Sequence, residues 1–247
     1  MESCKNRRRE VIDAGKAAAY LSKDPLLHMD MLECIRRGEA GLLYASGEGV
    51  LLRHTACGVV MMSAAAEEAA AEMLGLLDRA ELLVAHQEFY LSAVKSRLGI
   101  SSMTPCLQAV YPARRPLPER GGVEIRRLGE EYLSFLQEHY SHADGSDYLR
   151  GRLAAGVVFG AFENGCLAGF IGIHEEGAMG MLEVLPEYRR RGVAASLAAF
   201  LVNRLLEQGK VPYSHIIVGN SVSLSLHRKL GFTIASGTIY WSGLDQT

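Results

Sequence analysis

The residue types best suited to chemistry in this sequence lie in one short run of three arginines followed by a glycine and two apolar residues. The run is Arg189, Arg190, Arg191, Gly192, Val193 and Ala194, and it stands between a strand-like apolar segment and a long apolar segment. Where a helix begins, backbone N–H groups lack intrahelical acceptors and the helix dipole favours an anion. Gly192 lets the backbone approach a ligand closely, and a guanidinium group can bind two phosphate oxygens at once. The pattern therefore predicts a site for a pyrophosphate group.

The alternative is that residues 189–191 form a solvated basic face or a nucleic-acid patch, as most charge runs do. A formal net charge of -2 argues against nucleic acid as the main partner. A Walker-type loop is excluded because Gly-Lys-Ser/Thr does not occur, and no Gly-x-Gly-x-x-Gly follows an expected strand. The order of strand, Arg-x-x-Gly-x-Ala and helix favours the pyrophosphate site.

The elements that must position this loop follow from the hydrophobic pattern of the second half of the chain. Strands are expected at 123–127, 157–162, 167–173, 179–185, 213–218 and 232–241, and helices at 130–140, 148–153, 194–206 and 221–230. Asn164 and Gly165 indicate a hairpin turn between the second and third strands. The helix at 194–206 is almost entirely apolar, so we expect it to be covered on most sides. This order predicts a mixed sheet with helices on both faces.

The chain is long enough for two domains, and a proline- and glycine-rich run at 111–122 marks the clearest boundary in its 247 residues. Residues 1–115 are expected to form an N-terminal α/β domain and residues 122–247 the second domain. In the first, residues 12–32 have helical spacing in places, strands are expected at 40–44 and 49–53, and an alanine-rich helix is expected at 64–77. The fold class is therefore α/β or α+β.

Composition limits the compartment and the partners. Hydrophobic residues make up 49% of the chain and charged residues 22%, which is typical of a globular protein in water. The sequence contains neither a signal-peptide pattern nor an apolar run that could span a bilayer. Its five cysteines are scattered and its histidines lack metal-ligand spacing. We expect a cytoplasmic protein without metal, membrane or nucleic-acid partners. A homodimer is left open as a possible assembly.

Two ordered motifs resemble those of the GNAT superfamily of N-acetyltransferases. Residues 185–194 resemble motif A, whose Arg/Gln-x-x-Gly-x-Gly/Ala pattern falls on Arg189, Gly192 and Ala194. Residues 220–232, with Asn-Ser-Val-Ser followed by Leu-His-Arg-Lys-Leu-Gly-Phe, are similar to motif B. Two motifs in the right order are far more specific than either one alone.

Within the superfamily the chain most resembles the glycine N-acyltransferase-like branch. The resemblance rests on Met181, the run that begins at Leu185, residues 211–215 and Asn220. That branch pairs a degenerate N-terminal acyltransferase-like domain with a working C-terminal one. The resemblance therefore implies an acyl-CoA N-acyltransferase fold with a mixed, mostly antiparallel sheet for residues 122–247, and a degenerate relative of it for residues 1–115.

The resemblance also implies a reaction, in which an amine attacks the thioester of acetyl-CoA or another acyl-CoA directly in a ternary complex. The acceptor would be the primary amine of a small molecule or amino acid, and no metal would take part. The strand at 179–185 would splay from that at 213–218, so that pantetheine enters between them. The residues that the resemblance places on the cosubstrate are Leu182, Val184, Leu185, Arg189, Arg190, Arg191, Gly192, Val193, Ala194, Asn220, Ser223 and His227.

An amine is mostly protonated at neutral pH, so the reaction needs a base or a water relay. In the family register the usual glutamate falls on Ala178, which cannot accept a proton. Glu183 on the same strand is the first candidate, although a solvated strand carboxylate explains it equally well. Glu176 and His174, at the preceding turn, are the alternatives. His227 replaces the usual tyrosine that protonates the leaving thiolate, and a packing role for it is equally open.

Two further functions stay open at this stage. Ala178 at the family's base position would suit a non-catalytic acyl-CoA-binding sensor module, and residues 7–9 with 189–191 would suit a nucleic-acid binder. Four aromatic residues are candidates for lining an acceptor pocket, although core packing is the commoner fate of such residues: Tyr140, Tyr148, Phe159 and Phe170.

Overall fold

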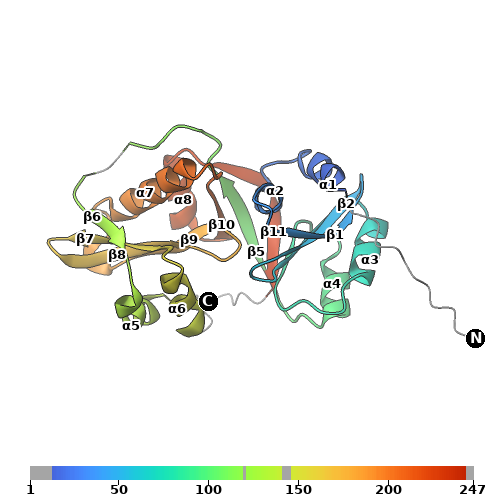
Figure 1. The fold of residues 1–247 in the computed structure, drawn as a ribbon, viewed down its shortest axis with the longest axis horizontal. Coiled ribbons are helices and arrows are strands. Elements are labelled where there is room, and N and C mark those ends of the chain that lie inside the picture. Colours follow the sequence, from blue (N-terminus) through green and yellow to red (C-terminus); the bar gives the residue numbers. More distant parts are fainter. Residues whose placement is uncertain (1–12, 119–120, 141–145, 243–247) are drawn as a thin grey trace, which may run out of the picture.

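The computed structural model describes residues 13–118, 121–140 and 146–242, which form two sheets with helices on their faces (Figure 1). The arginines at 7–9 lie outside the described residues. The first half of the chain contains α1 (Ala14–Leu21), α2 (Met29–Arg36), β1 (Ala40–Ala45), β2 (Gly49–His54), β3 (Val60–Ala64), α3 (Glu67–Gly75), β4 (Leu83–Ala85), α4 (Leu91–Leu98) and β5 (Met103–Val110).

The second half contains β6 (Glu124–Arg127), the 3-10 helix η1 (Glu130–Tyr132), α5 (Leu133–His139), α6 (Ser146–Ala154), β7 (Val158–Glu163), β8 (Cys166–Ile173), β9 (Met179–Val184), the 3-10 helix η2 (Pro186–Tyr188), α7 (Val193–Glu207), β10 (Tyr213–Ile217), α8 (Ser221–Lys229) and β11 (Thr233–Ser242). From α5 onward, its α-helices and strands follow the same order as those of the first half from α1 onward, and only the 3-10 helix η2 has no counterpart there. The two halves of the chain thus share one order of secondary-structure elements.

The two halves exchange their last strands. The seven-stranded sheet has the order β1-β2-β3-β4-β11-β5-β10, and the four-stranded sheet has the order β6-β7-β8-β9. Strand β11 pairs with β4 of the first half, and β5 pairs with β10 of the second. Figure 1 shows β5 and β11 side by side at the centre of the molecule. Backbone hydrogen bonds therefore join the two halves, whereas the division at residues 115–122 stays a prediction.

Apolar layers hold the helices on the sheets. The helix α7 buries Leu197, Leu201 and Val202 against Phe159 and other side chains of β7, β8 and β9, while α5 and α6 cover the opposite face (Figure 1). The expectation that this helix is largely covered is confirmed on its inner face, since eight of its 15 residues are buried. In the first half, α1 and α2 lie in one core cluster and α3 and α4 in another.

Helical spacing in places over 12–32 is confirmed by α1 and by the start of α2, which are separated by turns at 22–28. Two other expectations from the sequence need correction. The helix expected at 64–77 spans only Glu67–Gly75, because Ala64 is the last residue of β3. The single expected sheet is two sheets, because β9 and β10 do not pair. No helix in the described ranges is both long and apolar enough to cross a membrane.

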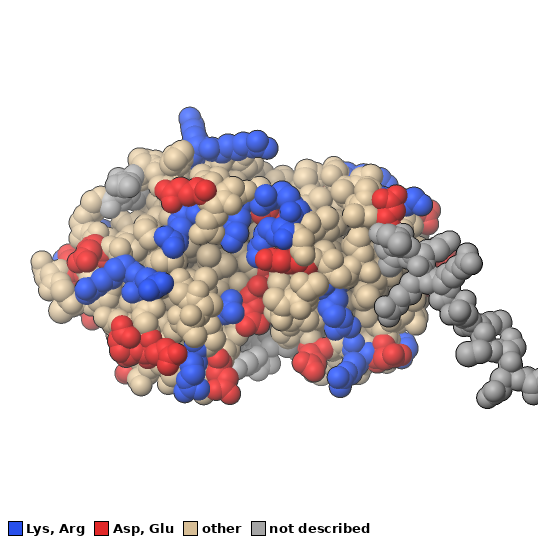
Figure 2. All heavy atoms as spheres, in the orientation of Figure 1, with Lys and Arg blue, Asp and Glu red and all other residues tan. Residues whose placement is uncertain are grey.

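Charged side chains are spread over the surface in small groups. Figure 2 shows one group of lysines and arginines near the middle of the viewed face, where the two halves of the chain meet. Carboxylates lie next to these cations on the same face (Figure 2). One of these small groups of mixed charge therefore lies at the junction of the halves.

Candidate active site

Strands β9 and β10 lie in contact but carry no hydrogen-bonded ladder, although both are fully described. Strand β9 pairs with β8 and strand β10 with β5, so the edges that face each other retain free backbone donors and acceptors. The equivalent strands of the first half, β3 and β4, are paired in parallel, with Met61 opposite Val84. The opening is thus a feature of the second half alone, and it can take an extended ligand that carries amide groups.

A β-bulge at Met181 sets which side chains of β9 face which layer. Met181 has a φ of 53°, and the pairing with β8 shifts between Phe170 and Gly172. Met181 consequently packs with α5 and α6, whereas Leu182 and Val184 pack with α7. Because strand side chains alternate, Glu183 lies on the α5 and α6 side. The bulge therefore determines on which face of the sheet Glu183, the first candidate base, lies. The sequence alone could not predict this face.

The N-terminus of α7 is open to a ligand. Gly192 is its N-cap residue with a φ of 90°, and a Cβ built there would meet no atom within 4 Å. The first backbone hydrogen bond of the helix joins the Ser196 N–H to the Gly192 carbonyl oxygen. The N–H groups of residues 193–195 therefore have no intrahelical acceptor. Val193 is buried and Ala194 is half-buried, so this turn presents its backbone to an anion.

The three arginines of the loop have different surroundings. Arg189 donates from Nε to the Val184 carbonyl oxygen at 2.9 Å, which ties the loop to the end of β9. Arg191 forms an ion pair with Glu163 at 3.0 Å. Arg190 is exposed with a φ of 62°, and no side-chain contact of it is found among the described residues. Arg190 is therefore the arginine best placed to bind a phosphate group, and Arg189 shapes the loop.

Leu185 links the start of this loop to the sheet. Its N–H donates to the Ala168 carbonyl oxygen at 3.0 Å, and it precedes the 3-10 helix η2. Leu185 thus continues the pairing of β9 with β8 by one residue, on the edge away from β10. Its position fits a role in shaping the opening.

The residues expected from motif B lie at the start of α8 and along its inner face. Asn220 accepts a hydrogen bond from the Ser223 N–H at 2.9 Å and so caps this helix. A small cavity of about 110 Å³ lies between β10 and this cap. It is lined by Leu107, Ile216, Ile217, Gly219, Asn220, Ser221 and Leu224. Asn220 thus shapes a hollow at the end of β10.

Both ring nitrogens of His227 are engaged within the protein. Nδ1 lies 2.8 Å from the Ser223 carbonyl oxygen and therefore donates to it, and Nε2 lies 3.0 Å from the Ser214 hydroxyl. Burial lowers the pKa of His227 below its ordinary value. A neutral, fully bonded imidazole favours the packing role for His227, and its role as proton donor stays a prediction.

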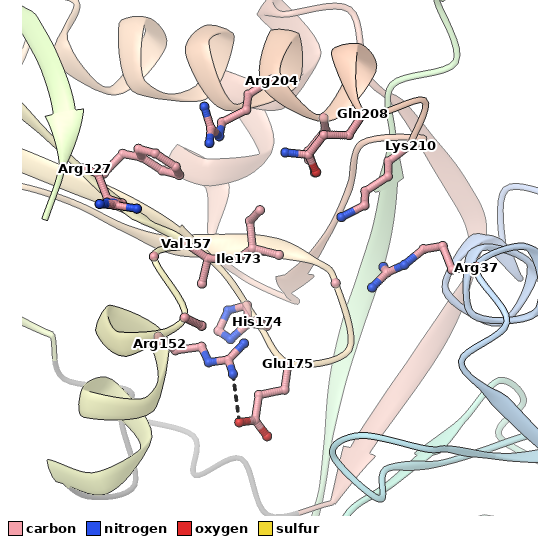
Figure 3. Close-up of a pocket in the computed structure, with 15 residues that line it drawn as sticks. Arg37, Arg127, Arg152, Val157, Ile173, His174, Glu175, Arg204, Gln208 and Lys210 are labelled. Carbon is pink, nitrogen blue, oxygen red and sulfur yellow. Dashed lines mark hydrogen bonds and ion pairs between the residues drawn. The ribbon is translucent and has the colours of Figure 1, made fainter. Parts of the chain in front are cut away.

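The turn between β8 and β9 carries the other candidate bases. His174 lies next to the ion pair of Arg152 and Glu175 (Figure 3), and its Nδ1 is 2.5 Å from the Tyr148 hydroxyl. Burial lowers the pKa of His174 to about 4. A ring that stays neutral and bonded at pH 7 is a weak base, so His174 is better suited to orient Tyr148.

Glu176 has the electrostatics of a general base. Only 7% of it is exposed, and burial raises the pKa of its carboxyl group to about 7, with a further contribution from the negative charge of Asp30. A base whose pKa lies near the working pH exchanges a proton most effectively. Glu176, one of the alternatives named from the sequence, thus combines burial with a pKa near neutrality, and its role as the base stays a prediction.

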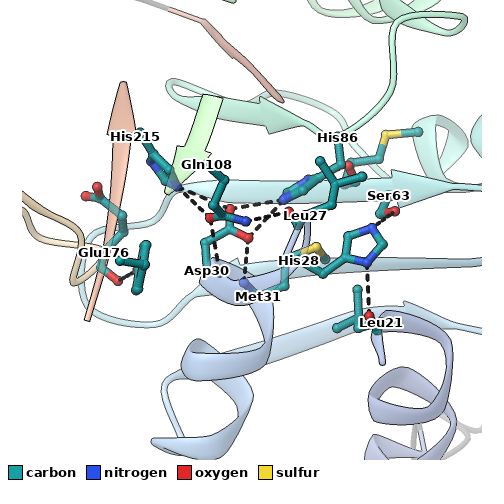
Figure 4. Close-up of polar contacts among 12 residues, drawn as sticks. Leu21, Leu27, His28, Asp30, Met31, Ser63, His86, Gln108, Glu176 and His215 are labelled. Carbon is teal, nitrogen blue, oxygen red and sulfur yellow. Dashed lines mark hydrogen bonds and ion pairs between the residues drawn. The ribbon is translucent and has the colours of Figure 1, made fainter. Parts of the chain in front are cut away.

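A buried polar network from the first half lies beside Glu176 (Figure 4). Asp30 of α2 is fully buried, lies 3.0 Å from His86 Nε2 and faces His215 of β10 at 3.9 Å. Burial acts to raise the pKa of Asp30, but His86 and His215 bring it down to about 2. Asp30 thus stays charged near Glu176. The sequence did not single out Asp30, because an acidic residue in an amphipathic helix carries no local signal of burial.

Two tyrosines complete the α5 and α6 side of the site. Burial raises the pKa of Tyr140, and the charges of Glu183 and Glu176 raise it further. Burial also raises the pKa of Tyr148, which bonds His174. Glu176, Glu183 and the two tyrosines are thus brought together. Of the four aromatic candidates, Phe159 and Phe170 are core residues instead.

Comparisons with known proteins concern the sequence of the second half and the fold of the chain. Residues 156–242, which span β7 to β11, match the sequence model of a family described as FR47-like protein. No curated protein sequence matches the chain. Among solved structures, a Drosophila protein is 20% identical with a TM-score of 0.60, covering 80% of this chain and 74% of that one.

Two further structures carry the name of a family. A protein from Novosphingobium aromaticivorans, assigned to the GNAT acetyltransferases, is 22% identical over 90% of this chain and 98% of that one, with a TM-score of 0.54. An acetyltransferase from the GNAT family of Colwellia psychrerythraea is 13% identical over 92% and 94%, with a TM-score of 0.53. The chain therefore has the fold of GNAT acyltransferases, with a mostly antiparallel sheet flanked by helices.

Proposed function

We propose that the chain is an acyl-CoA-dependent N-acyltransferase, with acetyl-CoA as its first candidate donor and a small amine or amino acid as its acceptor. The observation that carries this proposal is the unpaired edge between β9 and β10, which leads to the open N-terminus of α7 at Gly192. The fold match and the quoted motifs support it. The resemblance to the glycine N-acyltransferase-like branch supports an amino acid or similar small acceptor.

The residues present fit the chemistry of coenzyme A. The free edge of β9 can pair with the amide groups of pantetheine, and the N–H groups of residues 193–195 with Arg190 can bind the pyrophosphate. When bound, acyl-CoA supplies the activated thioester. The apolar side chains of Leu182 and Val184 and the cap at Asn220 would then shape the walls of the groove.

The first half serves as an internal comparison and supports a single CoA site. Its strands β3 and β4 are paired, so no edge is free for pantetheine. Its helix α3 has Ala66 as its N-cap residue, follows no arginine loop, and carries Glu67 and Glu68 in its first turn. These carboxylates already complement the helix dipole and repel an anionic ligand. We therefore propose that this half supports the site structurally.

Glu176 is the base that we propose for the transfer. It accepts a proton from the ammonium group of the acceptor, and the neutral amine attacks the thioester carbonyl carbon. The C–N bond forms and the C–S bond breaks, and the thiolate takes up the proton that the attacking nitrogen loses, so that the products are an amide and the free thiol of CoA. N–H groups on the edge of β9 that faces β10 would stabilise the negative charge on the carbonyl oxygen. Glu183 remains the second candidate for the base.

Release of free thiol from acetyl-CoA across a panel of amines and amino acids tests this proposal. The proposal predicts turnover with at least one amine and none without an acceptor. Tight CoA binding without turnover across the panel would contradict it and favour a non-catalytic acyl-CoA sensor. An absence of CoA binding would contradict both functions.

A further inference from the structure

A cavity of about 350 Å³ lies at the far end of α7, where the two halves of the chain meet (Figure 3). Five cationic residues line it, each from a different element or loop: Arg37, Arg127, Arg152, Arg204 and Lys210. Glu175 is the only carboxylate in its described lining. The cavity therefore has a strong excess of positive charge.

Two of these cations are compensated by neighbouring carboxylates. Arg37 forms an ion pair with Glu39 at 2.5 Å, and Arg152 forms one with Glu175 at 3.1 Å. Gly177 allows Arg37 to approach, because a Cβ at this glycine would collide with the guanidinium group. Arg37 is thus held against the turn that carries Glu176, and it connects the first half of the chain to the cavity.

The other three cations have no ion-pair partner among the described residues: Arg127, Arg204 and Lys210. Arg204 lies over the ring of Phe159, 5.0 Å from its centroid, which holds the guanidinium group at the cavity wall. Partial burial and the nearby charge of Arg37 lower the pKa of Lys210. The residues around Lys210 thus disfavour its positive charge. A bound anion would stabilise that charge and raise the pKa of Lys210.

Arg152 supplies a separate sign that an acceptor is needed. Its Nε atom is buried without a hydrogen-bond partner in the described protein, although its Nη2 bonds Glu175. A buried donor without an acceptor costs free energy, more so on a charged group. The Nε atom itself has almost no accessible surface, so an anion in the cavity reaches it only if the guanidinium group turns.

The cavity is distinct from the proposed CoA groove. Its α7 residues, Arg204 and Leu205, lie in the last turn of a 15-residue helix whose first turn begins at Val193. A helix of that length spans about 20 Å, so one pyrophosphate group cannot contact both ends. Gly192 and Arg190 do not line the cavity. Any ligand here is therefore additional to CoA.

We propose that this cavity is a second anion site that binds a small molecule with two or more anionic groups, phosphate or carboxylate. Four arginines line the cavity, and their guanidinium groups can bind several oxygens at once, more than a single monovalent anion supplies. Because Arg37 belongs to the first half and the other cations to the second, the bound anion clamps the halves together. It would also fix the position of the turn that carries Glu176.

Titration calorimetry on the full chain at low ionic strength tests the site, with citrate and inorganic pyrophosphate as the two probes. Pyrophosphate is titrated into the Gly192→Glu protein, in which the proposed pyrophosphate site at the α7 N-terminus is blocked. We expect one of them to bind at one site per chain. The double variant Arg204→Gln/Lys210→Gln should weaken this binding by about tenfold or more, because each change removes a charge-assisted contact. Both side chains lie at the surface of the cavity, and thermal unfolding would check that the variant folds.

Two controls separate this site from the CoA groove and from unspecific charge. The double variant Lys95→Gln/Arg97→Gln removes the same charge from the exposed end of α4, so it should keep the affinity within about twofold. The Gly192→Glu protein should also keep the probe site, whether or not it binds CoA. Failure of both probes to bind would overturn the proposal. Unchanged probe binding in the Arg204→Gln/Lys210→Gln variant would also overturn it. An equal loss of probe binding in the α4 variant would overturn it as well.

Discussion

The hydroxyl group of Tyr213 donates a hydrogen bond to the backbone carbonyl oxygen of Glu176 at 2.8 Å. This bond crosses from β10 to the turn before β9, along the edge where the two strands lack a ladder. Tyr213 is 1% exposed, and burial raises its pKa well above the ordinary value, so its hydroxyl stays protonated as a donor. One buried side chain therefore holds the candidate base beside a groove that must stay open.

The substitution Tyr213→Phe tests this positioning role. It removes the hydroxyl group and keeps the ring, so the protein should fold while the turn with Glu176 loses its anchor. A buried hydrogen bond contributes about 1 kcal/mol, so we expect kcat to fall roughly fivefold or somewhat more. The Kd for CoA should stay unchanged, because Tyr213 does not contact the α7 N-terminus. Equal losses in kcat and CoA affinity would indicate a general packing role instead.

Paired substitutions decide between the two candidate bases. Glu176→Gln should lower kcat by about 100-fold or more at unchanged CoA affinity, since a general base contributes on this scale. Glu183→Gln should have a much smaller effect, and Glu138→Gln, on the exposed side of α5, should have none. The steady-state rates of the three variants at saturating acetyl-CoA provide the measurement. A larger loss of kcat in Glu183→Gln than in Glu176→Gln would instead identify Glu183 as the base.

The rate should depend on pH through the carboxyl group of Glu176. Its raised pKa of about 7 means that it is protonated and inactive below that pH, and ionised and active above it. The charges of Asp30, Glu175 and Arg152 act on it from α2, the turn itself and α6. We therefore expect kcat/KM to rise with pH and to inflect near pH 7. The inflection should vanish in Glu176→Gln, whereas a profile that is unchanged in this variant would show that another group titrates.

The sequence predicted the elements around the groove because their signals are local. Strand β9 is an apolar run that ends before Pro186, and the Arg-x-x-Gly-x-Ala loop and the apolar start of α7 follow it directly. The hairpin of β7 and β8 turns at Asn164, whose φ of 50° suits the expected turn. Periodicity and turn residues were sufficient for these features.

The remaining features depend on contacts between distant parts of the chain. Strand β5 was not expected, and its pairing with β10 joins residues about a hundred positions apart, for which no local pattern exists. Glu176 was named only as an alternative, because its burial arises when α2, α6 and β10 pack around one turn. The bulge at Met181 likewise follows from pairing with β8 rather than from the residue itself. Tertiary packing therefore decides which carboxylate could act.

The most direct test of the central claim compares the two ends of α7 by titration calorimetry with CoA. Gly192 and Gly209 both have positive φ angles, of 90° and 70°, and both face open space. Gly192→Glu and Gly209→Glu thus introduce the same charge and a similar backbone strain at the N-terminal and C-terminal ends of one helix. We predict a loss of CoA affinity of about 100-fold or more for Gly192→Glu and nearly native affinity for Gly209→Glu. Native CoA affinity in the Gly192→Glu protein, or an equal loss in both, would contradict the claim that this helix start binds the cosubstrate.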